Sequence, residues 1–231
     1  MKMNKLNPRY VVMLAAAAAC LASRAPAQTT PSTAAPGGQA PAAFGVVGTN
    51  YTDFTFGEDR RESFSPSVIH DYDFTYNQSV FSSELWGLDS NVRYDYAASG
   101  ARGHSDHRQE VLAGTTAYML QSWGKPFVSA DAGYAWQRAG VVARKSFADD
   151  FTGGVEFQVL RQLAVSPFVE YQSEPHLWND IRNAFFPDRQ WDYGVKATYR
   201  FTPQWGVSAG LQMDQFSRDD WGYRLGVNFH F

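Results

Sequence analysis

The chain has 231 residues, of which 23 are acidic and 20 are basic, so its formal net charge is -3. This acidic balance offers no basic surface for a phosphate backbone, which argues against nucleic acid as a partner. The one cysteine, Cys20, excludes an internal disulfide, so the fold must depend on packing, hydrogen bonds and ion pairs.

The first 27 residues have the three parts of a secretory signal peptide. Basic residues come first, an apolar run follows over 11–19, and Ala-Pro-Ala at 25–27 supplies a small-x-small cleavage site. Because so short an apolar run cannot span a bilayer as a stable helix, we expect residues 1–27 to be removed after export. The alternative is a lipoprotein signal acylated on Cys20, but Ala17 stands where such signals usually have Leu.

The next segment, residues 28–43, contains no large apolar side chain. Such a segment cannot bury enough surface to offset its chain entropy, so we expect a flexible periplasmic lead. The composition does not change again after it, which predicts a single domain over 44–231.

Within this domain, large apolar residues alternate with small or polar ones in one segment after another. A period of two residues predicts β-strands with one apolar face. The predicted strands cover residues 44–56, 67–77, 85–97, 109–121, 126–138, 150–160, 164–173, 190–201, 205–216 and 221–231. We therefore expect an all-β fold of ten strands, with eight as the alternative if one of the first two strands is irregular.

The connections between these strands alternate in length. Short connections are expected at 78–84, 122–125, 161–163 and 202–204, and longer polar ones at 57–66, 98–108, 139–149 and 174–189. The short connection at 217–220 departs from this trend. Outer-membrane barrels have short periplasmic turns and long external loops, so the pattern predicts an antiparallel meander with both ends of the barrel chain on the periplasmic side.

The last segment, W-G-Y-R-L-G-V-N-F-H-F over 221–231, resembles the C-terminal signature of bacterial outer-membrane β-barrel proteins. In those proteins alternating apolar residues lead to a terminal Phe that the barrel-assembly machinery reads. The corresponding residues here are Tyr223, Leu225, Val227, Phe229 and Phe231. With the strand pattern, the resemblance to small OmpA-like, OmpX-like and opacity-type barrels implies a closed antiparallel transmembrane β-barrel in an outer membrane.

Alternation alone also fits a soluble β-sandwich, whose apolar face points inward. The aromatic residues of the apolar face, however, gather near the strand ends. Near the expected periplasmic end are Tyr76, Trp86, Tyr199, Phe201, Trp205, Phe229 and Phe231, and near the outer end are Phe54, Phe56, Tyr94, Tyr96, Trp136, Tyr171, Trp191, Tyr193, Trp221 and Tyr223. Smaller apolar residues lie between them, which predicts two aromatic belts around an aliphatic band, as at the two surfaces of a membrane.

The opposite face of the strands carries charge, which predicts a hydrated and paired lumen. Its members are Asp53, Asp71, Asp73, Asp89, Arg93, Asp95, Asp131, Glu156, Glu170, Asp192, Lys196, Arg200, Asp214 and Arg224. We expect Asp214 opposite Arg224 with Asp53 nearby, and Asp71 and Asp73 beside Arg93. His70 and Glu110 are the charged or titratable residues expected on the apolar face, near its outer end.

No sequence motif for catalysis, a cofactor or a phosphate is present, so we predict no enzyme, no cofactor and no metal site. Omptin proteases, which are ten-stranded barrels, use acidic pairs and a His–Asp pair near the outer rim. Asp71 and Asp73 with His176 and Asp180 could be arranged in that way, but only the residue types match. His104, Asp106 and His107 have metal-ligating side chains, as a polar loop often does.

The resemblance to small outer-membrane barrels implies a monomer with a structural or surface-interaction role. Its loops would meet lipopolysaccharide or neighbouring surfaces, and its lumen would be filled by paired charges. The alternative is a narrow channel for ions or small solutes. Since acids outnumber bases on the lumenal face, such a channel would prefer cations.

Overall fold

The structure is a computed structural model that describes residues 46–61, 67–99, 106–139, 142–173, 189–214 and 221–231. The predicted signal peptide and lead, 1–27 and 28–43, lie outside these residues and remain predictions. Within the described part of the chain, no helix has both the length and the apolar character needed to cross a membrane.

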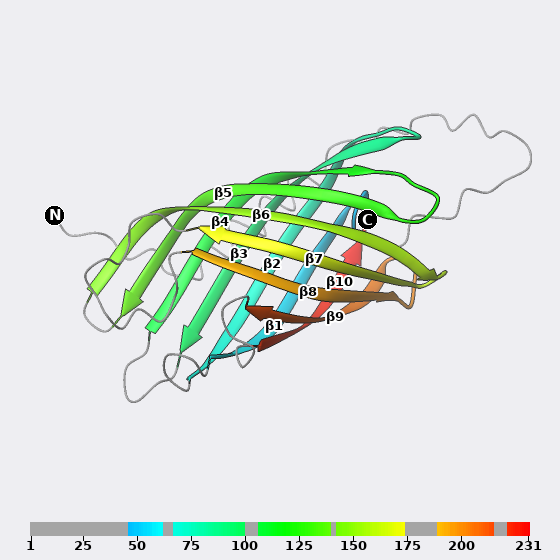
Figure 1. Ribbon diagram of the computed structural model, residues 1–231. Coiled ribbons are helices and arrows are strands. Elements are labelled where there is room, and N and C mark those ends of the chain that lie inside the picture. Colours follow the sequence, from blue (N-terminus) through cyan, green and yellow to red (C-terminus); the bar gives the residue numbers. More distant parts are fainter. Residues whose placement is uncertain (1–45, 62–66, 100–105, 140–141, 174–188, 215–220) are drawn as a thin grey trace, which may run out of the picture. The chain divides into compact units, whose positions relative to one another are not determined.

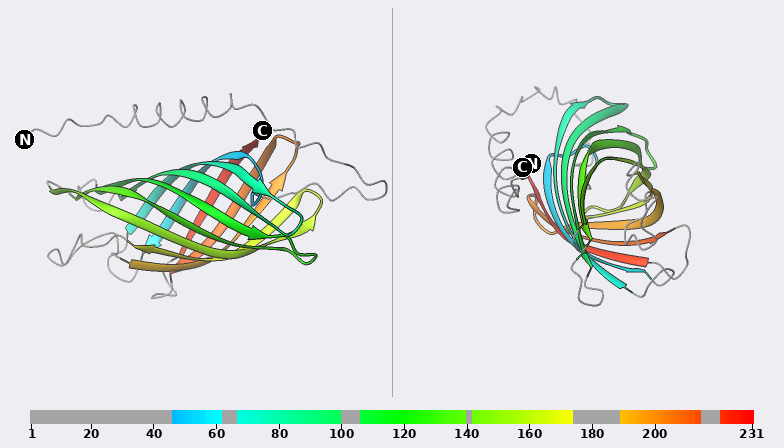
Figure 2. Two further views of the ribbon diagram at one scale, coloured as in Figure 1. Left: turned by 90° about the horizontal axis from the view of Figure 1, so that it is seen from above. Right: turned by 90° about the vertical axis from the view of Figure 1, so that its left-hand side faces the viewer.

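Ten strands form one closed antiparallel barrel (Figure 1). They are β1 (Tyr51–Arg61), β2 (Ser67–Ser82), β3 (Trp86–Ser99), β4 (Asp106–Met119), β5 (Lys125–Ala139), β6 (Val142–Leu160), β7 (Leu163–Ser173), β8 (Arg189–Arg200), β9 (Trp205–Asp214) and β10 (Trp221–His230). Each strand pairs with its neighbours in sequence, and β1 pairs with β10 to close the ring (Figure 2). The predicted ten-stranded meander is therefore confirmed, and the eight-stranded alternative is wrong.

The two ends of the barrel differ in the connections that they carry. The turns at 83–85, 120–124, 161–162 and 201–204 gather at one end, called here the turn end. β1 begins and β10 ends at the turn end, because the strand number is even. The connections at the opposite end, called the loop end, lie outside the described residues.

The first strand was predicted to begin at residue 44, and this boundary is wrong. The pairing of β1 with β2 and β10 begins only at Tyr51, and residues 46–50 form a turn. Gly48 has a positive φ of 79°, a backbone conformation that interrupts a strand.

The long polar loop predicted at 139–149 is also wrong, because β6 begins at Val142. β5 and β6 pair without a break from Ala139 opposite Val142 to Lys125 opposite Glu156. Lys145 lies on the outward face of this hairpin, with its Nζ 4.1 Å from the centroid of the Tyr134 ring. A cation is stabilised over the face of an aromatic ring. Lys145 can therefore occupy a strand, although its charge alone favoured a loop.

The outward face of the barrel is mostly apolar, with polar residues such as His70 and Lys145 near the loop end. In the middle of the strands, side chains such as Val92, Val207 and Leu225 are 42–54% exposed. Near the turn end the rings of Trp205 and Phe229 lie 4.9 Å apart, and rings also meet near the loop end. A continuous apolar surface between two aromatic belts is the exterior that a bilayer covers.

The inward face is mostly polar, but it also holds aromatic rings, among them that of Tyr51. Tyr118, Phe127 and Phe168 occupy the same alternating positions of their strands as the inward polar residues. Phe168 lies over Gly194 on the neighbouring strand, where an added Cβ would be 2.9 Å from the ring. Small residues beside large ones allow side chains to fill the interior of a barrel of this size.

Candidate functional site: the lumenal charge network

Most of the charged residues that were predicted to face the lumen do point into the barrel. Eight of its carboxylates are buried inside the barrel: Asp53, Asp71, Asp73, Asp89, Asp131, Glu156, Glu170 and Asp192. The side chains of Asp95, Arg93, Lys196, Arg200 and Arg224 are partly buried on the same face. The side chain of Asp214 lies outside the described part of the molecule, so only its backbone position on β9 is known.

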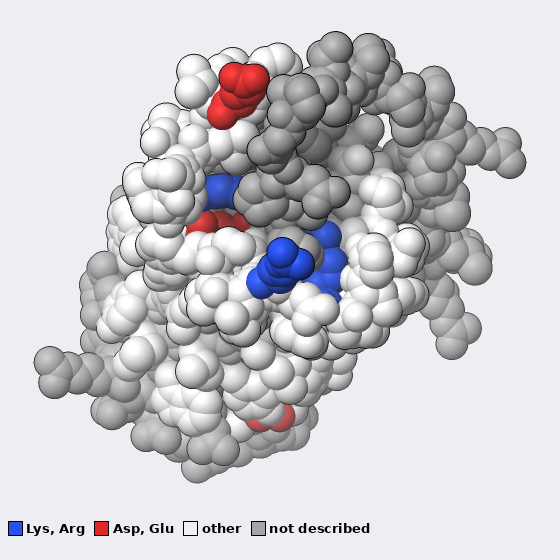
Figure 3. All heavy atoms as spheres, turned by 90° about the vertical axis from the view of Figure 1, so that its right-hand side faces the viewer, with Lys and Arg blue, Asp and Glu red and all other residues white. Residues whose placement is uncertain are grey.

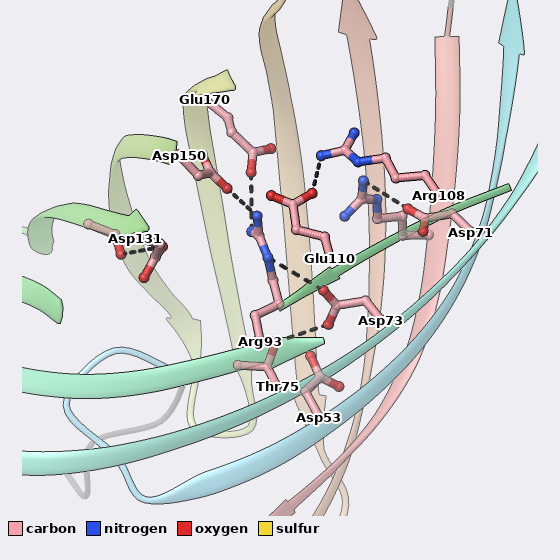
Figure 4. Close-up of polar contacts among 12 residues, drawn as sticks. Asp53, Asp71, Asp73, Thr75, Arg93, Arg108, Glu110, Asp131, Asp150 and Glu170 are labelled. Atoms are coloured by element: carbon pink, nitrogen blue, oxygen red, sulfur yellow. Dashed lines mark hydrogen bonds and ion pairs between the residues drawn. The ribbon is translucent and has the colours of Figure 1, made fainter. Parts of the chain in front are cut away.

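Arg93 crosses the lumen. It starts from β3, and its Nη2 and Nη1 atoms reach Asp150 on β6 and Glu170 on β7, the latter at 3.4 Å. Its Nε lies 3.8 Å from Oδ2 of Asp73 on β2 (Figure 4). One guanidinium therefore holds carboxylates from both sides of the barrel, which neutralises charges that would be costly to bury unpaired.

Asp150 is a member of this cluster that the sequence analysis missed. It is the first residue of the predicted strand 150–160 and shares its alternation with Glu156, whose carboxylate also points inward. The period of two was therefore a sufficient signal for its orientation. Its contact with Arg93 was not predictable, because their strands are far apart in the ring.

A second ion pair also bridges strands that are not neighbours. Lys196 Nζ on β8 lies 2.9 Å from Oδ2 of Asp53 on β1, with β9 and β10 between them. Gly210 stands directly opposite Lys196 on β9, so no side chain on that position blocks the path. The lumen is thus crossed from β8 to β1 as well as from β3 to β7.

Arg224 on β10 also forms an ion pair with a strand that is not its neighbour, because its side chain reaches past β1. Its Nη2 lies 3.1 Å from Oδ2 of Asp71 on β2, and the residue between them on β1 is Gly57. A Cβ added to Gly57 would be 3.0 Å from Cγ of Arg224. The glycine therefore makes room for the arginine stem to reach the next strand but one.

The predicted pairing of Arg224 with Asp214 is wrong. Arg224 lies opposite Gly210, and Trp221 lies opposite Met213. The register between β9 and β10 therefore differs by four residues from the predicted one. Asp53 is likewise held by Lys196, and the ion pair of Asp71 is with Arg224.

Glu110 is a second correction. It was expected on the apolar outward face, but it is 3% exposed and pairs with Arg108 inside the barrel. The register explains this orientation, because Glu110 lies opposite Asp95, whose side chain points inward. His70 does lie on the outward face, with its Nδ1 3.4 Å from Glu58.

Apolar side chains pack on the inward face next to this network. Leu112, Ala135 and Ala148 form one fully buried inward cluster, and Ile69 and Ala97 form another toward the loop end. Between the ion pairs, a cavity of about 160 Å³ remains, lined by charged side chains, by hydroxyls and by the rings of Tyr51 and Phe168. Ion pairs, apolar clusters and this cavity thus lie together in the described part of the lumen.

Only some of the residues considered for enzyme or metal chemistry lie in the described part of the chain. Asp71 and Asp73 face arginines, whereas His176, Asp180 and His104 and the side chain of Asp106 lie outside the described residues. The ring of His107 stacks 6.3 Å from that of Tyr96. Among the described residues, no group of three or more His, Cys, Asp or Glu side chains could hold a metal ion.

Comparison with known proteins finds similarity only among solved structures, since no protein family and no curated sequence matches the chain. The β domain of the Bordetella autotransporter BrkA is 9% identical, with a TM-score of 0.48, over 80% of this chain and 99% of that one. The translocator domain of the autotransporter NalP from Neisseria meningitidis is 7% identical, with a TM-score of 0.43, over 79% and 88%. The outer-membrane enzyme PagL is 13% identical, with a TM-score of 0.39, over 78% and 99%.

The barrel itself is established by the strand register of this chain. It is a closed antiparallel meander of ten strands. At these low identities the likeness concerns the fold alone and assigns no activity, so any function must be argued from the lumen and the surface of the chain itself.

Proposed function

We propose that the protein is an integral outer-membrane β-barrel with a structural or surface-interaction role and a lumen plugged by ion pairs. The observation that carries the proposal is the path of Arg93, which joins β3 to β6 and β7 through the middle of the barrel. A barrel of about eight strands is just filled by side chains, and open channels appear at roughly sixteen, so ten strands lie near the filled end.

The outward face supports the location. An apolar exterior bounded by aromatic belts needs a bilayer, and the export signal predicted over 1–27 would deliver the chain to the envelope. A closed barrel has no strand edge from which unfolding can begin. We therefore expect recovery with the outer membrane and slower unfolding in detergent, visible as a mobility change on heating. Recovery from a soluble periplasmic fraction would contradict the proposal.

The surface near the loop end supports contact with anionic lipid headgroups, such as those of lipopolysaccharide. Lys145 Nζ lies 4.1 Å from the centroid of Tyr134 and 5.3 Å from that of Trp136, at the level of the aromatic belt. A cation held over belt aromatics is positioned at the height of headgroup phosphates. The loops at that end would make the remaining surface contacts of a monomeric barrel.

The decisive experiment is single-channel recording on the refolded protein in planar bilayers. A plugged lumen predicts no steady openings in the wild type. Arg93→Ala and Arg224→Ala each remove one end of an ion pair, so conductance should appear or rise in these variants. Lys145→Ala, which changes the outward face, is the matched control. Large, steady and weakly selective openings in the wild type would refute the plug.

The second candidate is a narrow cation-preferring channel. It is favoured by the cavity of about 160 Å³ between the ion pairs and by the excess of acidic groups that face the lumen. Small steady steps with a reversal potential that favours cations in a salt gradient would support this candidate over the plugged barrel.

A further inference from the structure

The residues just before β1 lie at the turn end of the lumen, and they make hydrogen bonds there through their backbone. These residues are Val46 to Asn50, called here the strap. Thr49 Oγ1 donates a hydrogen bond to the carbonyl of Val46 at 3.0 Å, which holds the strap as a turn. Val47 is 5% exposed, so the strap is packed into the barrel.

One side of the strap binds to buried charged groups on β3, β5 and β6. Glu156 Oε2 on β6 accepts the N–H of Val46 at 2.9 Å and that of Val47 at 3.4 Å. Asp89 Oδ2 on β3 accepts the N–H of Gly48 at 2.7 Å. Two carboxylates that are almost fully buried thus receive three consecutive backbone donors.

A lysine completes this arrangement. Lys125 Nζ on β5 donates to the carbonyl of Val47 at 3.1 Å and to Oε1 of Glu156 at 3.2 Å. The group formed by Asp89, Lys125 and Glu156 therefore satisfies three backbone N–H groups and one carbonyl of the same short segment. Such a set of donors and acceptors recognises peptide backbone and not particular side chains.

The strap is anchored at its other end to the two strands that flank β1. Asn77 Nδ2 on β2 donates to the carbonyl of Thr49 at 2.7 Å, and Asn50 Oδ1 accepts the N–H of Ser79 at 2.7 Å. The N–H of Phe231 donates to the carbonyl of Asn50 at 3.2 Å. The strap thus reaches from β2 and the C-terminal end of β10 to β3, β5 and β6, across the mouth.

Gly48 is required for this path. Its φ of 79° favours glycine, and a Cβ at this position would lie 2.8 Å from the hydroxyl oxygen of Tyr118, an inward ring of β4. Seen from the turn end, a basic and an acidic side chain adjoin in a recess of the described surface, and further basic side chains lie on the surface beside it (Figure 3).

We propose that Asp89, Lys125 and Glu156 form a peptide-backbone binding site at the turn end, which this chain fills with its own residues 46–48, and that the filled site closes that mouth of the barrel. The buried carboxylates need hydrogen-bond donors, and the strap supplies them. The strap and its binding site are together called the latch. The latch lies at the mouth and is separate from the ion pairs that cross the middle of the lumen.

The test is the reactivity of a thiol in the strap. In the full chain with Cys20→Ser, Val47→Cys places one cysteine of similar volume in the closed mouth, and Gln121→Cys places one on an exposed turn at the same end. We expect a bulky, membrane-impermeant maleimide to label position 47 at least about tenfold more slowly than position 121, because labelling requires local opening.

Adding Asp89→Asn and Glu156→Gln should bring the labelling rate at position 47 close to that at position 121. The matched control is Asp131→Asn, which changes a buried lumenal carboxylate that hydrogen-bonds to Ser129. It should leave the rate at position 47 unchanged. Equal labelling of positions 47 and 121 in the otherwise unaltered barrel would overturn the proposal, as would slow labelling that persists in the latch variant.

A measurement on the unsubstituted chain guards against a folding defect in these variants. The amide protons of Val46, Val47 and Gly48 should exchange with solvent more slowly than those of the exposed turn residues Ser122 and Trp123. Equally fast exchange would refute the latch. Neither readout depends on conductance, so a failure of the central plug and a failure of the strap are distinguishable.

Discussion

The outward face and the lumen are made by the same ten strands, but they depend on their residues in different ways. Outside, Val92, Val207 and Leu225 need only be apolar and of moderate size, since lipid adapts to their shape. Inside, Arg93 serves carboxylates from three other strands. The outward face thus depends on average composition, and the lumen depends on individual pairs and on the small residues between them.

The largest expected effect is on the inside. Arg93→Ala would leave Asp150, Glu170 and Asp73 without their shared cation, and breaking such a buried pair costs about 3–5 kcal/mol. Urea unfolding of the refolded barrel in lipid would measure the loss. Adding Asp150→Asn and Glu170→Gln removes the uncompensated charges and should restore part of the lost free energy of unfolding. If the triple variant is no more stable than Arg93→Ala, the arginine acts by packing rather than by charge.

The corresponding test of the outward face is a charge in the aliphatic band. Leu225→Arg places a cation near the middle of the membrane and should cost about 2–4 kcal/mol in the same unfolding measurement. Tyr223→Arg, two residues nearer the loop end on the same face, should cost only about 0–1 kcal/mol. Equal losses at both positions would mean that the strand does not cross the bilayer at the expected depth.

A smaller effect compares two strand glycines, one on each face. Gly57→Ala would place a Cβ 3.0 Å from Cγ of Arg224 and from the carbonyl oxygen of Tyr223, so it should displace the arginine from Asp71 and cost about 1–3 kcal/mol. At Gly153 on the outward face, an added Cβ meets only Val128 at 4.0 Å. Gly153→Ala should therefore be neutral or stabilising. A neutral Gly57→Ala would show that the space over β1 is not needed.

The same contrast explains what the sequence could predict. Alternation identified every strand, and β10 was placed at 221–231 against Trp221–His230, because large outward residues repeat without interruption. Alternation also set which way most side chains point. It cannot set the register between strands, because a shift of two or four residues leaves every side chain on the same face. The pairing of Arg224 with Asp71 instead of Asp214 is the consequence.

Two further features had only weak signals. The outer half of β6 was not predicted, because the charge of Lys145 is typical of a loop. In the structure Lys145 lies over the rings of Tyr134 and Trp136, which come from the neighbouring strand. The strap was not predicted because it binds through its own backbone groups, which no side-chain pattern reports. The traces that it leaves in the sequence are Gly48 and the inward acids Asp89 and Glu156, whose donors could not be named without the fold.

The smallest expected effect on stability is at Phe231, whose ring is half exposed and stacks 5.8 Å from that of Tyr76. Phe231→Ala keeps the backbone hydrogen bond to Asn50 and removes one exposed belt contact, so it should cost less than about 1 kcal/mol. In cells the loss should be larger, because the resemblance to outer-membrane barrels assigns this ring to recognition by the assembly machinery.

The matched control for that recognition is Trp205→Ala, which removes a belt ring of the same end that contacts Phe229 but does not belong to the terminal signature. Refolding yield in detergent and the amount assembled in cells should fall together for Trp205→Ala. For Phe231→Ala the cellular amount should fall well below the refolding yield. Parallel losses in both variants would mean that Phe231 acts as one more apolar residue of an interchangeable outward face. A selective cellular loss would instead make this ring the outward residue that, like those of the lumen, depends on one specific partner.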